Sequence, residues 1–401
     1  MIPKTKVTIT NVFGPLNRGD FELFEQLARL LPNTEIHAIA RDPSGASSYF
    51  PSIQFHPQPG TSLDRNGRSG RILAAIRTLA LVSSAHIPLA GFLLPAAQRS
   101  SLNVIRESAL VIACPGGYLT NATHSYYPQV AQIYFAAARA KKLWLAPMSI
   151  GPAERLLERK FLKLALEGAE SVYVRETWSQ RFCRELGIDS VISTDLAFLP
   201  ARDLLEALPR PAANCIAATI VRWNFPDSSN ADKAAEQYHR AMAEVLDRTS
   251  ERLNLPVKLL LQVDNDRAVT ERVARLMSAE VEIVRVDTPE EYRSILSAAA
   301  IMFGSRFHSA VFSMSVGTPT VVISYLPKGR YMMEDMGLRE LVIDIEDVTA
   351  DALDEMAQTL TRNDRDLRHR SQSAIKELLT EIRNPFITRL EERLKELANE
   401  S

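Results

Sequence analysis

The sequence predicts an α/β protein of two doubly wound, Rossmann-like domains. Short β-branched runs alternate with longer segments of helical periodicity, a pattern typical of a parallel sheet covered by helices. The alternation occurs twice, and the two series are separated by a stretch around Pro209-Arg210-Pro211 that contains no clear strand. We therefore predict domains over 1–205 and 206–383, followed by a C-terminal helix over 384–401 that packs back on the first domain.

The first domain is predicted from strand and helix segments that follow one another closely. The expected strands are 7–11, 35–39, 110–114, 143–149 and 171–174. The expected helices include 21–31, 129–140, 155–167 and 177–186. These strands are apolar and β-branched, which favours a buried parallel sheet.

The second domain restarts the alternation. Its expected strands are 215–221, 257–262, 281–284 and 319–324, with a long helix ending near 253 and a charged terminal helix over 386–398. Two such domains facing each other across a cleft, with a terminal helix crossing back, describe the GT-B architecture of sugar-transferring enzymes. We expect the cleft to be lined by loops at the carboxyl ends of the strands.

The composition argues against a globally charged partner surface. The chain of 401 residues has 47 basic and 48 acidic side chains, a formal net charge of −1. No global field attracts nucleic acid, so any anion site must be local. The widely spaced Cys114, Cys183 and Cys215 favour neither a disulfide framework nor structural zinc. With no export signal in its first residues, the sequence predicts a cytoplasmic protein.

One apolar segment, 72–97, raises the question of membrane contact. It contains Arg77, His86, Pro88 and Pro95, unlike a spanning helix. We predict a helical hairpin here. Either it is an inserted pair of core helices, or it rests on the inner face of the plasma membrane near a lipid-linked acceptor.

The strongest group of polar residues follows a glycine, in Gly304-Ser305-Arg306-Phe307-His308-Ser309, before the helical run 310–316. Ser305, Ser309 and the N–H groups of a first helical turn can bind a phosphate or carboxylate, which Arg306 can clamp with two charge-assisted bonds. His308 can exchange a proton near neutral pH. The alternative is that Arg306 pairs with a nearby acid and His308 caps or packs the helix.

This stretch and its continuation Ser324-Tyr325-Leu326-Pro327-Lys328 resemble the C-terminal signature of the polysaccharide pyruvyltransferase family. Other segments resemble family motifs in the expected order over about residues 5 to 340. They are Asn17-Arg18-Gly19-Asp20, Pro115-Gly116-Gly117-Tyr118, Ser149-Ile150-Gly151-Pro152, Arg175 with Ser179, Leu186 and Gly187, and Thr194-Asp195-Leu196-Ala197. Several such motifs in order are hard to obtain by chance.

The resemblance implies an enzyme that transfers a pyruvyl group from phosphoenolpyruvate onto two hydroxyls of a sugar as a cyclic ketal. The implied acceptor is a galactose, glucose, mannose or N-acetylmannosamine unit of a surface polysaccharide, such as an exopolysaccharide, or its lipid-linked precursor. Phosphoenolpyruvate is the donor substrate, and no further cofactor is expected. Two hypotheses assign the chemistry: His308 is the acid/base group, and the arginines stabilise the leaving phosphate.

Two further cations are candidate donor ligands. Arg222 follows the first strand of the second domain, and the resemblance supports a donor-binding arginine at this strand end. The alternative is a surface ion pair with Asp227 or Asp232. Lys328 either adds a positive charge to the donor site or is a solvated loop lysine.

The acceptor candidates lie in loops of the first domain. Asp20, beside Asn17, is either the N-cap of a helix beginning at Phe21 or a ligand for a sugar hydroxyl. Gly116 and Gly117 allow close backbone approach, although a tight turn needs glycine as well. Pro115 replaces a glycine that is more common in the family and removes an N–H donor. The following polar and aromatic cluster includes Asn121, His124 and Tyr126, which suit either sugar binding or an ordinary surface loop.

Two rival functions remain open, and no metal site is predicted. Asp264 and Asp266 resemble cation ligands, but their place between a strand and a helix favours capping. The first rival is a glycosyltransferase of GT-B fold that uses a nucleotide sugar, with Glu334 or Asp335 on the ribose. The second is a catalytically silent glycan-binding relative, for which Pro115 is the one indication.

Overall fold

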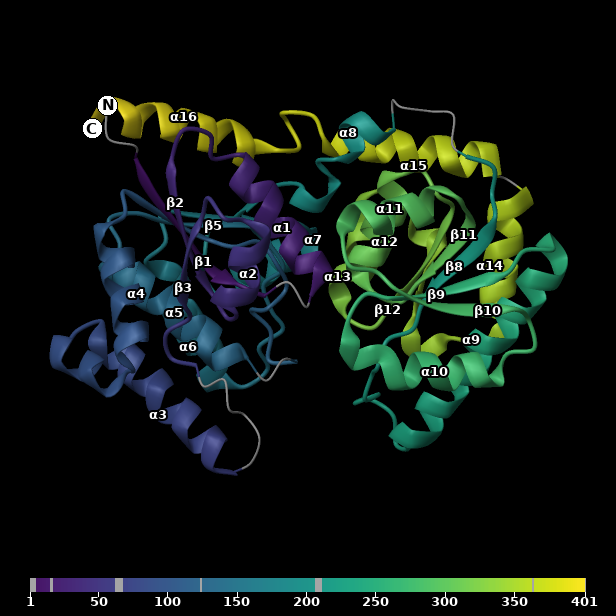
Figure 1. The fold of residues 1–401 in the computed structure, drawn as a ribbon, viewed down its shortest axis with the longest axis horizontal. Coiled ribbons are helices and arrows are strands. Elements are labelled where there is room, and N and C mark those ends of the chain that lie inside the picture. The colour runs from purple at the N-terminus through teal and green to yellow at the C-terminus, as the bar shows by residue number, and fades with distance from the viewer. Residues whose placement is uncertain are drawn as a thin grey trace. The chain divides into compact units, whose positions relative to one another are not determined.

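The computed structural model describes residues 5–14, 17–61, 68–122, 125–205, 211–362 and 364–400. The chain forms two compact units, one comprising Met1–Leu196 with Glu381–Ser401 and the other Ala197–Thr380. Each unit is a parallel sheet with helices on both sides (Figure 1), so the predicted α/β fold class is confirmed. The chain leaves the first unit after Leu196, nine residues before the expected boundary at 205, so the short helix α8 (Ala201–Leu204) falls in the second unit.

The sheet of the first unit has, in the described residues, seven parallel strands in the order β3-β2-β1-β4-β5-β6-β7. The strands are β1 Lys6–Val12, β2 Glu35–Ala40, β3 Gln54–Pro57, β4 Leu110–Ala113, β5 Leu143–Met148, β6 Ser171–Val174 and β7 Val191–Ile192. The helices are α1 Arg18–Arg29, α2 Pro43–Tyr49, α3 Arg68–Ser84, η1 Pro88–Leu93, α4 Ala96–Glu107, α5 Tyr126–Arg139, α6 Leu156–Glu167, α7 Thr177–Glu185 and α16 Pro385–Glu400.

Side-chain alternation along β5 and β6 shows how both faces of this sheet are covered. Leu143 and Leu145 point into the apolar core beneath α5 and α6, so Trp144 points to the opposite face. There its ring lies 6.1 Å from that of Tyr173, which in turn lies 5.1 Å from the ring of Phe386 on α16. The terminal helix therefore closes the second face of the sheet.

The sheet of the second unit has six parallel strands, within the described residues, in the order β10-β9-β8-β11-β12-β13. The strands are β8 Cys215–Thr219, β9 Val257–Leu261, β10 Val281–Arg285, β11 Ala299–Gly304, β12 Thr320–Ser324 and β13 Val342–Asp344. The helices are α9 Ala231–Leu253, η3 Asp264–Asp266, α10 Arg267–Leu276, α11 Pro289–Ser297, α12 Phe307–Ser315, α13 Pro327–Asp335, η4 Arg339–Leu341, η5 Ile345–Asp347, α14 Ala350–Arg362 and α15 Asp364–Leu378.

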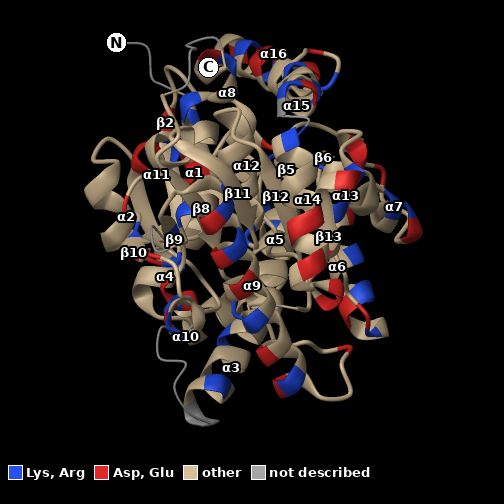
Figure 2. Ribbon diagram, turned by 90° about the vertical axis from the view of Figure 1, so that its right-hand side faces the viewer, with Lys and Arg blue, Asp and Glu red and all other residues tan. Residues whose placement is uncertain are grey.

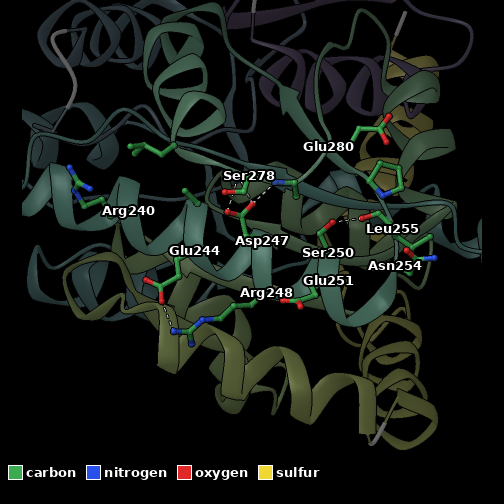
Figure 3. Close-up of a pocket in the computed structure, with 14 residues that line it drawn as sticks. Arg240, Glu244, Asp247, Arg248, Ser250, Glu251, Asn254, Leu255, Ser278 and Glu280 are labelled. Atoms are coloured by element: carbon green, nitrogen blue, oxygen red, sulfur yellow. Dashed lines mark hydrogen bonds and ion pairs between the residues drawn. The ribbon is translucent and has the colours of Figure 1, made fainter.

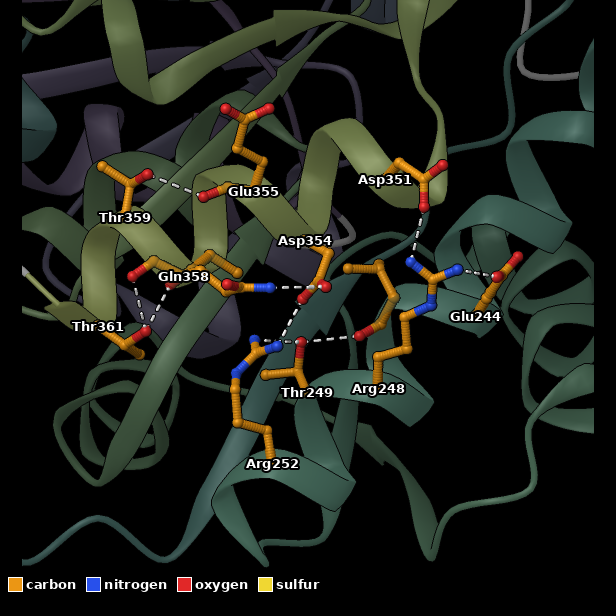
Figure 4. A network of polar contacts seen from close by, with 12 residues as sticks. Glu244, Arg248, Thr249, Arg252, Asp351, Asp354, Glu355, Gln358, Thr359 and Thr361 are labelled. Atoms are coloured by element: carbon orange, nitrogen blue, oxygen red, sulfur yellow. Dashed lines mark hydrogen bonds and ion pairs between the residues drawn. The ribbon is translucent and has the colours of Figure 1, made fainter.

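A surface network aligns α9 with α14 (Figure 4). Arg248 contacts Asp351 at 2.8 Å, and Arg252 contacts Asp354 at 2.5 Å. Gln358 donates to the same Asp354 at 3.0 Å. Each of these surface ion pairs contributes little stability by itself. Together they favour one alignment of the two helices.

Both sheets have the Rossmann strand order, with a point at which the order of strands reverses. In the first unit this point lies between β1 and β4, and in the second between β8 and β11. The connections leave these neighbouring strands toward opposite sides, which opens a crevice at their carboxyl ends. Each crevice is the expected place for a ligand in its unit.

Candidate functional site

The candidate donor site lies at the strand reversal of the second unit. Thr219 of β8 is paired with Gly304 of β11. Arg222 follows the first strand and Arg306 follows the second, and α12 begins directly after Arg306. The positive end of the α12 dipole therefore faces the crevice, and Arg222 and Arg306 follow the two strands that border it.

Arg306 forms a two-pronged ion pair with Asp266. Its Nε donates to Asp266 Oδ2 at 2.7 Å and its Nη2 donates to Oδ1 at 2.6 Å, the parallel geometry of a strong arginine–carboxylate pair. The backbone N–H of Arg222 donates to the same Oδ1 at 2.9 Å. Asp266 is 2% exposed, whereas the Arg306 side chain is 20% exposed. The pairing with a nearby acid that the sequence offered as the alternative for Arg306 is therefore present. The carboxylate orients the guanidinium, and donor binding by the exposed part of Arg306 stays a prediction.

The predicted capping role of Asp266 is wrong. The residue occupies the N-cap position of α10, but its side chain makes no capping hydrogen bond. Its oxygens point instead across the strand ends to Arg306, where they form a stronger charge-assisted contact. Among the described residues, no group of three or more His, Cys, Asp and Glu side chains is placed to hold a metal ion.

An aromatic pair borders the other side of the guanidinium. The Tyr325 hydroxyl lies 3.4 Å from Arg306 Nη1, and the Trp223 ring lies 5.0 Å from the Tyr325 ring. Burial alone lowers the pKa of Arg306, but Tyr325 and Asp266 outweigh it and raise that pKa. Burial alone raises the pKa of the Tyr325 phenol, yet the charges of Arg306 and Lys328 lower it. The site thus combines a permanently charged guanidinium with a phenol that ionises more easily than usual.

Ser305 and Ser309 fasten the loop from inside. The Ser305 hydroxyl lies 2.8 Å from that of Tyr238, whose pKa burial raises to about 12. The Ser309 hydroxyl lies 2.9 Å from Thr219 Oγ1 and donates to the Arg306 carbonyl at 2.5 Å. Both serines are 0% exposed. Direct donor binding by these hydroxyls stays a prediction; in this structure they rigidify the loop that carries Arg306.

His308 lies in the first turn of α12, two residues after Arg306. Its ring is 5.2 Å from that of Phe307 and 6.3 Å from that of Phe312, and the residue is 5% exposed. The packing that the sequence offered as an alternative is therefore present. An acid/base role stays a prediction. It requires that the edge of this largely buried ring reaches the bound donor.

Arg222 and Lys328 add positive charge to the rim. Arg222 is exposed and, among the described residues, has no acidic partner within ion-pair distance, so the alternative pair with Asp227 or Asp232 does not form. Lys328, in the first turn of α13, is half-buried with its Nζ 5.3 Å from the centre of the Phe307 ring. Donor binding by Arg222 and Lys328 stays a prediction.

Two acceptor candidates meet at the strand reversal of the first unit. Asn17 is the N-cap of α1, and its Nδ2 donates to Asp20 Oδ2 at 2.5 Å. The expectation that the helix begins at Phe21 with Asp20 as its cap is wrong: the helix starts three residues earlier, at Arg18, and Asn17 occupies the N-cap position without a side-chain capping hydrogen bond. A Cβ on Gly116 would lie 3.8 Å from Asp20 Oδ1. The first turn of α1 and the loop after β4 thus lie close together, and Gly117 in that loop is partly exposed.

The remaining acceptor candidates are tied to Glu158 of α6. Asn121 Nδ2 donates to its Oε2 at 3.0 Å, and the Tyr126 hydroxyl donates to its carbonyl at 2.9 Å. Tyr126 is 2% exposed, so it offers no ring face to a sugar, whereas Tyr127 is 45% exposed. The loop composition could not show which tyrosine α5 turns inward. His124 lies outside the described residues.

The motif residues Arg175 and Asp195 form a buried ion pair in the first unit. Arg175 Nη1 lies 2.6 Å from Asp195 Oδ2, and the two side chains are 1% and 4% exposed. Arg175 Nε also donates to Ser149 Oγ at 2.9 Å, which ties the end of β5 to the end of β6. These motif residues therefore hold the strand ends together.

A separate cavity of about 730 Å³ opens at the other end of the second sheet (Figure 3). It lies beside α9, where the lining residues Pro256 and Glu280 immediately precede the strands β9 and β10. Asp247 accepts hydrogen bonds from the backbone N–H groups of Ser278 and Ala279 there. None of the predicted site residues lines it, and strand amino ends are not where doubly wound sheets bind ligands.

Comparison with known proteins decides the family. The model of the polysaccharide pyruvyl transferase family matches residues 21–327. The chain belongs to the polysaccharide pyruvyl transferase family. The predicted resemblance is confirmed, and this family member is a transferase of that kind. It is also 24% identical over 361 residues to the amylovoran biosynthesis protein AmsJ of Erwinia amylovora, covering 82% of this chain and 86% of the relative.

Solved structures place this pyruvyl transferase family member in the GT-B fold class. A UDP-GlcNAc 2-epimerase from Neisseria meningitidis superimposes with a TM-score of 0.60 at 10% identity, covering 98% of this chain and 100% of that one. A glycosyltransferase from Rickettsia africae gives 0.57 at 13% identity, covering 99% and 100%. Identities this low show the fold alone.

Proposed function

We propose that this chain transfers a pyruvyl group from phosphoenolpyruvate to two hydroxyls of a sugar as a cyclic ketal, in surface polysaccharide biosynthesis. Family membership and the likeness to AmsJ support the reaction class. The donor assignment rests on the position of Arg306: it lies directly before α12, and its guanidinium is oriented by Asp266. The acceptor would be a sugar of the polysaccharide or of its lipid-linked precursor.

The charges of the second-unit crevice suit a compact dianion. Phosphoenolpyruvate carries a phosphate and a carboxylate on one small skeleton, so it needs two neighbouring positive sites. Asp266 accepts from Nε and from one N–H of Nη2, and the Tyr325 hydroxyl accepts from one N–H of Nη1, which leaves one N–H on each Nη of Arg306 for an anion. Arg222 and Lys328 supply the second positive site, and the α12 dipole adds to it.

The reaction needs one proton donor and one proton acceptor. A proton is added to the terminal methylene carbon of phosphoenolpyruvate, and one sugar hydroxyl attacks the adjacent carbon. The second sugar hydroxyl then displaces phosphate, so one hydroxyl proton ends on the new methyl group and the other leaves with phosphate. We assign the proton exchange to His308 and stabilisation of the leaving phosphate to Arg306 and Arg222.

The acceptor side is assigned to the first-unit crevice. Asp20, oriented by Asn17, and the backbone around Gly116 and Gly117 supply an acceptor of sugar hydroxyl protons and a close backbone approach. The galactose, glucose, mannose and N-acetylmannosamine acceptors of the family remain the candidates. A lipid-linked acceptor would bring the protein to the inner face of the plasma membrane.

Phosphate release from phosphoenolpyruvate tests this proposal. The panel contains β-galactosides, glucosides, mannosides and lipid-linked N-acetylmannosamine, with Arg306→Ala as the control. We expect release that requires both an acceptor and Arg306, and donor binding weakened in the variant by about 1.5–3 kcal/mol. Consumption of nucleotide sugars in place of phosphoenolpyruvate would instead favour a glycosyltransferase. Glycan binding without turnover of either donor would favour a silent relative.

A further inference from the structure

The exposed apolar side chains of the chain are concentrated on one hairpin. Half of the sixteen large hydrophobic side chains that are exposed in the described residues lie within 72–93, on α3, on η1 and at the residue before η1. They are Ile72 (56%), Leu73 (41%), Ile76 (48%), Leu79 (66%), Ile87 (59%), Leu89 (74%), Phe92 (68%) and Leu93 (67%). We call these eight side chains the hairpin surface. Contiguous apolar patches of this kind mark interaction sites in soluble domains.

The hairpin is anchored on its inner side. Leu81, Leu94 and Leu102 are 0–3% exposed and belong to the apolar core of the first unit. The outward residues of α3 recur at helical spacing, which puts Ile72, Ile76 and Leu79 on one face. The sequence left open whether 72–97 forms core helices or a surface; the structure buries one side and exposes the other. Among the described residues, no helix is long and apolar enough to span a bilayer.

The charge of this region is entirely positive. Between residues 65 and 106 the sequence has arginines at 65, 68, 71, 77, 99 and 106 and no aspartate or glutamate. In Figure 2 α6 and α9 carry both signs, whereas α3 carries basic residues without acidic ones. Arg71, Arg77 and Arg99 make no ion pair with a described residue. Arg106 is turned inward, with its guanidinium 5.4 Å from the centre of the buried Phe135 ring, and is not counted as part of the basic edge. This contrasts with the net charge of −1 of the whole chain.

One cation lies directly beside the apolar side chains. The Arg99 guanidinium is 5.0 Å from the centre of the Phe92 ring, which is 68% exposed. Arg71 is exposed one residue before Ile72. An apolar face edged by arginines matches the boundary between acyl chains and anionic head groups, where such side chains bury their stems and keep their charges in water.

We propose that the hairpin surface binds an anionic lipid bilayer, with Leu89, Phe92 and Leu93 entering the head-group region and the arginines contacting lipid phosphates. Two copies of this chain docked through the same surface would place uncompensated arginines against each other, which disfavours self-association. A bilayer of anionic lipid supplies the opposite charge. The inference names a partner for the first unit and requires neither donor nor sugar binding.

Vesicle sedimentation of the full-length protein tests the inference. The probes are vesicles of phosphatidylcholine alone and of phosphatidylcholine mixed with phosphatidylglycerol. We expect binding to the mixed vesicles that weakens as salt is raised. Phe92→Glu and Leu89→Glu should each lower the partition coefficient roughly tenfold or more, and Arg71→Gln roughly fivefold. Ile382→Glu makes the same chemical change at a side chain that is 90% exposed elsewhere, and its binding should equal that of the wild type.

Three results would overturn the inference. They are failure of the wild type to bind the mixed vesicles, equal loss in Ile382→Glu, and a dimer in light scattering that Phe92→Glu converts to monomers without any vesicle binding. Thermal unfolding of each variant separates a binding defect from misfolding. Because the vesicle assay contains no phosphoenolpyruvate or sugar, its outcome is independent of the phosphate-release assay, in which Phe92→Glu should retain activity on a soluble acceptor.

Discussion

Asp266 binds the guanidinium of Arg306 through both carboxylate oxygens, across the carboxyl end of the strand between them. Asp266 follows β9 and Arg306 follows β11, and β8 lies between these two strands in the sheet. The same carboxylate accepts the N–H of Arg222, which follows β8. Three strand ends are thus joined by one side chain. The guanidinium is oriented before any donor arrives, which lowers the entropy lost on binding.

Replacing Asp266 should loosen both the fold and the site. Asp266→Ala leaves a largely buried guanidinium without its partner, and we expect the free energy of unfolding to fall by about 1–3 kcal/mol. Urea denaturation measures this. Asp264→Ala is the matched control, since Asp264 is half-exposed and lies 3.9 Å from Arg267 and Arg285. Its change should stay within about 0.5 kcal/mol, and equal changes in both variants would contradict the structural role of Asp266.

His308 should affect turnover more than donor affinity. If it exchanges the proton, His308→Gln lowers kcat roughly 100-fold or more while phosphoenolpyruvate still binds. Single-turnover phosphate release and calorimetric donor titration separate the two quantities. His86→Gln is the control at an exposed histidine. Near-normal turnover of His308→Gln would rule out the acid/base assignment and leave His308 as a packing residue between Phe307 and Phe312.

Tyr325 should ionise below the usual tyrosine range. Because the charges of Arg306 and Lys328 lower its pKa in the folded state, ionisation stabilises the fold at alkaline pH. This stabilisation is fully present above the unfolded pKa of about 10 and is lost as the pH falls through the lowered folded value. Phenolate absorbance of the wild type and Tyr325→Phe should differ by one tyrosine in that window. In Arg306→Ala the Tyr325 pKa should rise, and an unchanged titration would refute the coupling.

The terminal helix should be essential to the stability of the first unit. Phe386 is 0% exposed and packs on Tyr173, and the neighbouring Asn384 Oδ1 accepts from Ser193 Oγ at 2.7 Å. Phe386→Ala should lower the free energy of unfolding by about 3–5 kcal/mol. Ile382→Ala, at a 90% exposed site nearby, should leave it unchanged. Equal stability of the two variants in chemical denaturation would show that α16 is not part of this core.

The strands with a strong apolar pattern were predictable from the sequence, whereas the short strands at the edges of the first sheet were not. The strands predicted at 7–11, 35–39 and 257–262 consist mostly of β-branched or apolar residues, and they match β1, β2 and β9 closely. The short β3 and β7 were not predicted, because edge strands of two to four residues carry too little apolar pattern. β11 was not predicted either, since its alanine-rich start is typical of helices.

The candidate site likewise has a part that the sequence predicted and a part that only the structure showed. The sequence alone determined that Arg306 and His308 stand just before an apolar helical run, because glycine, serine and arginine before such a run are a local pattern. The strand β11 before them, and the start of α12 at Phe307 in place of residue 310, came from the structure. It also determined the family, through motifs in order along the chain. Only the tertiary structure decided that Asp266, forty residues away, orients Arg306, that Ser305 and Ser309 turn inward, and that the 72–93 hairpin exposes its apolar side. Those outcomes depend on which strands become neighbours and which side of a helix is buried, and side-chain contacts between distant segments set both.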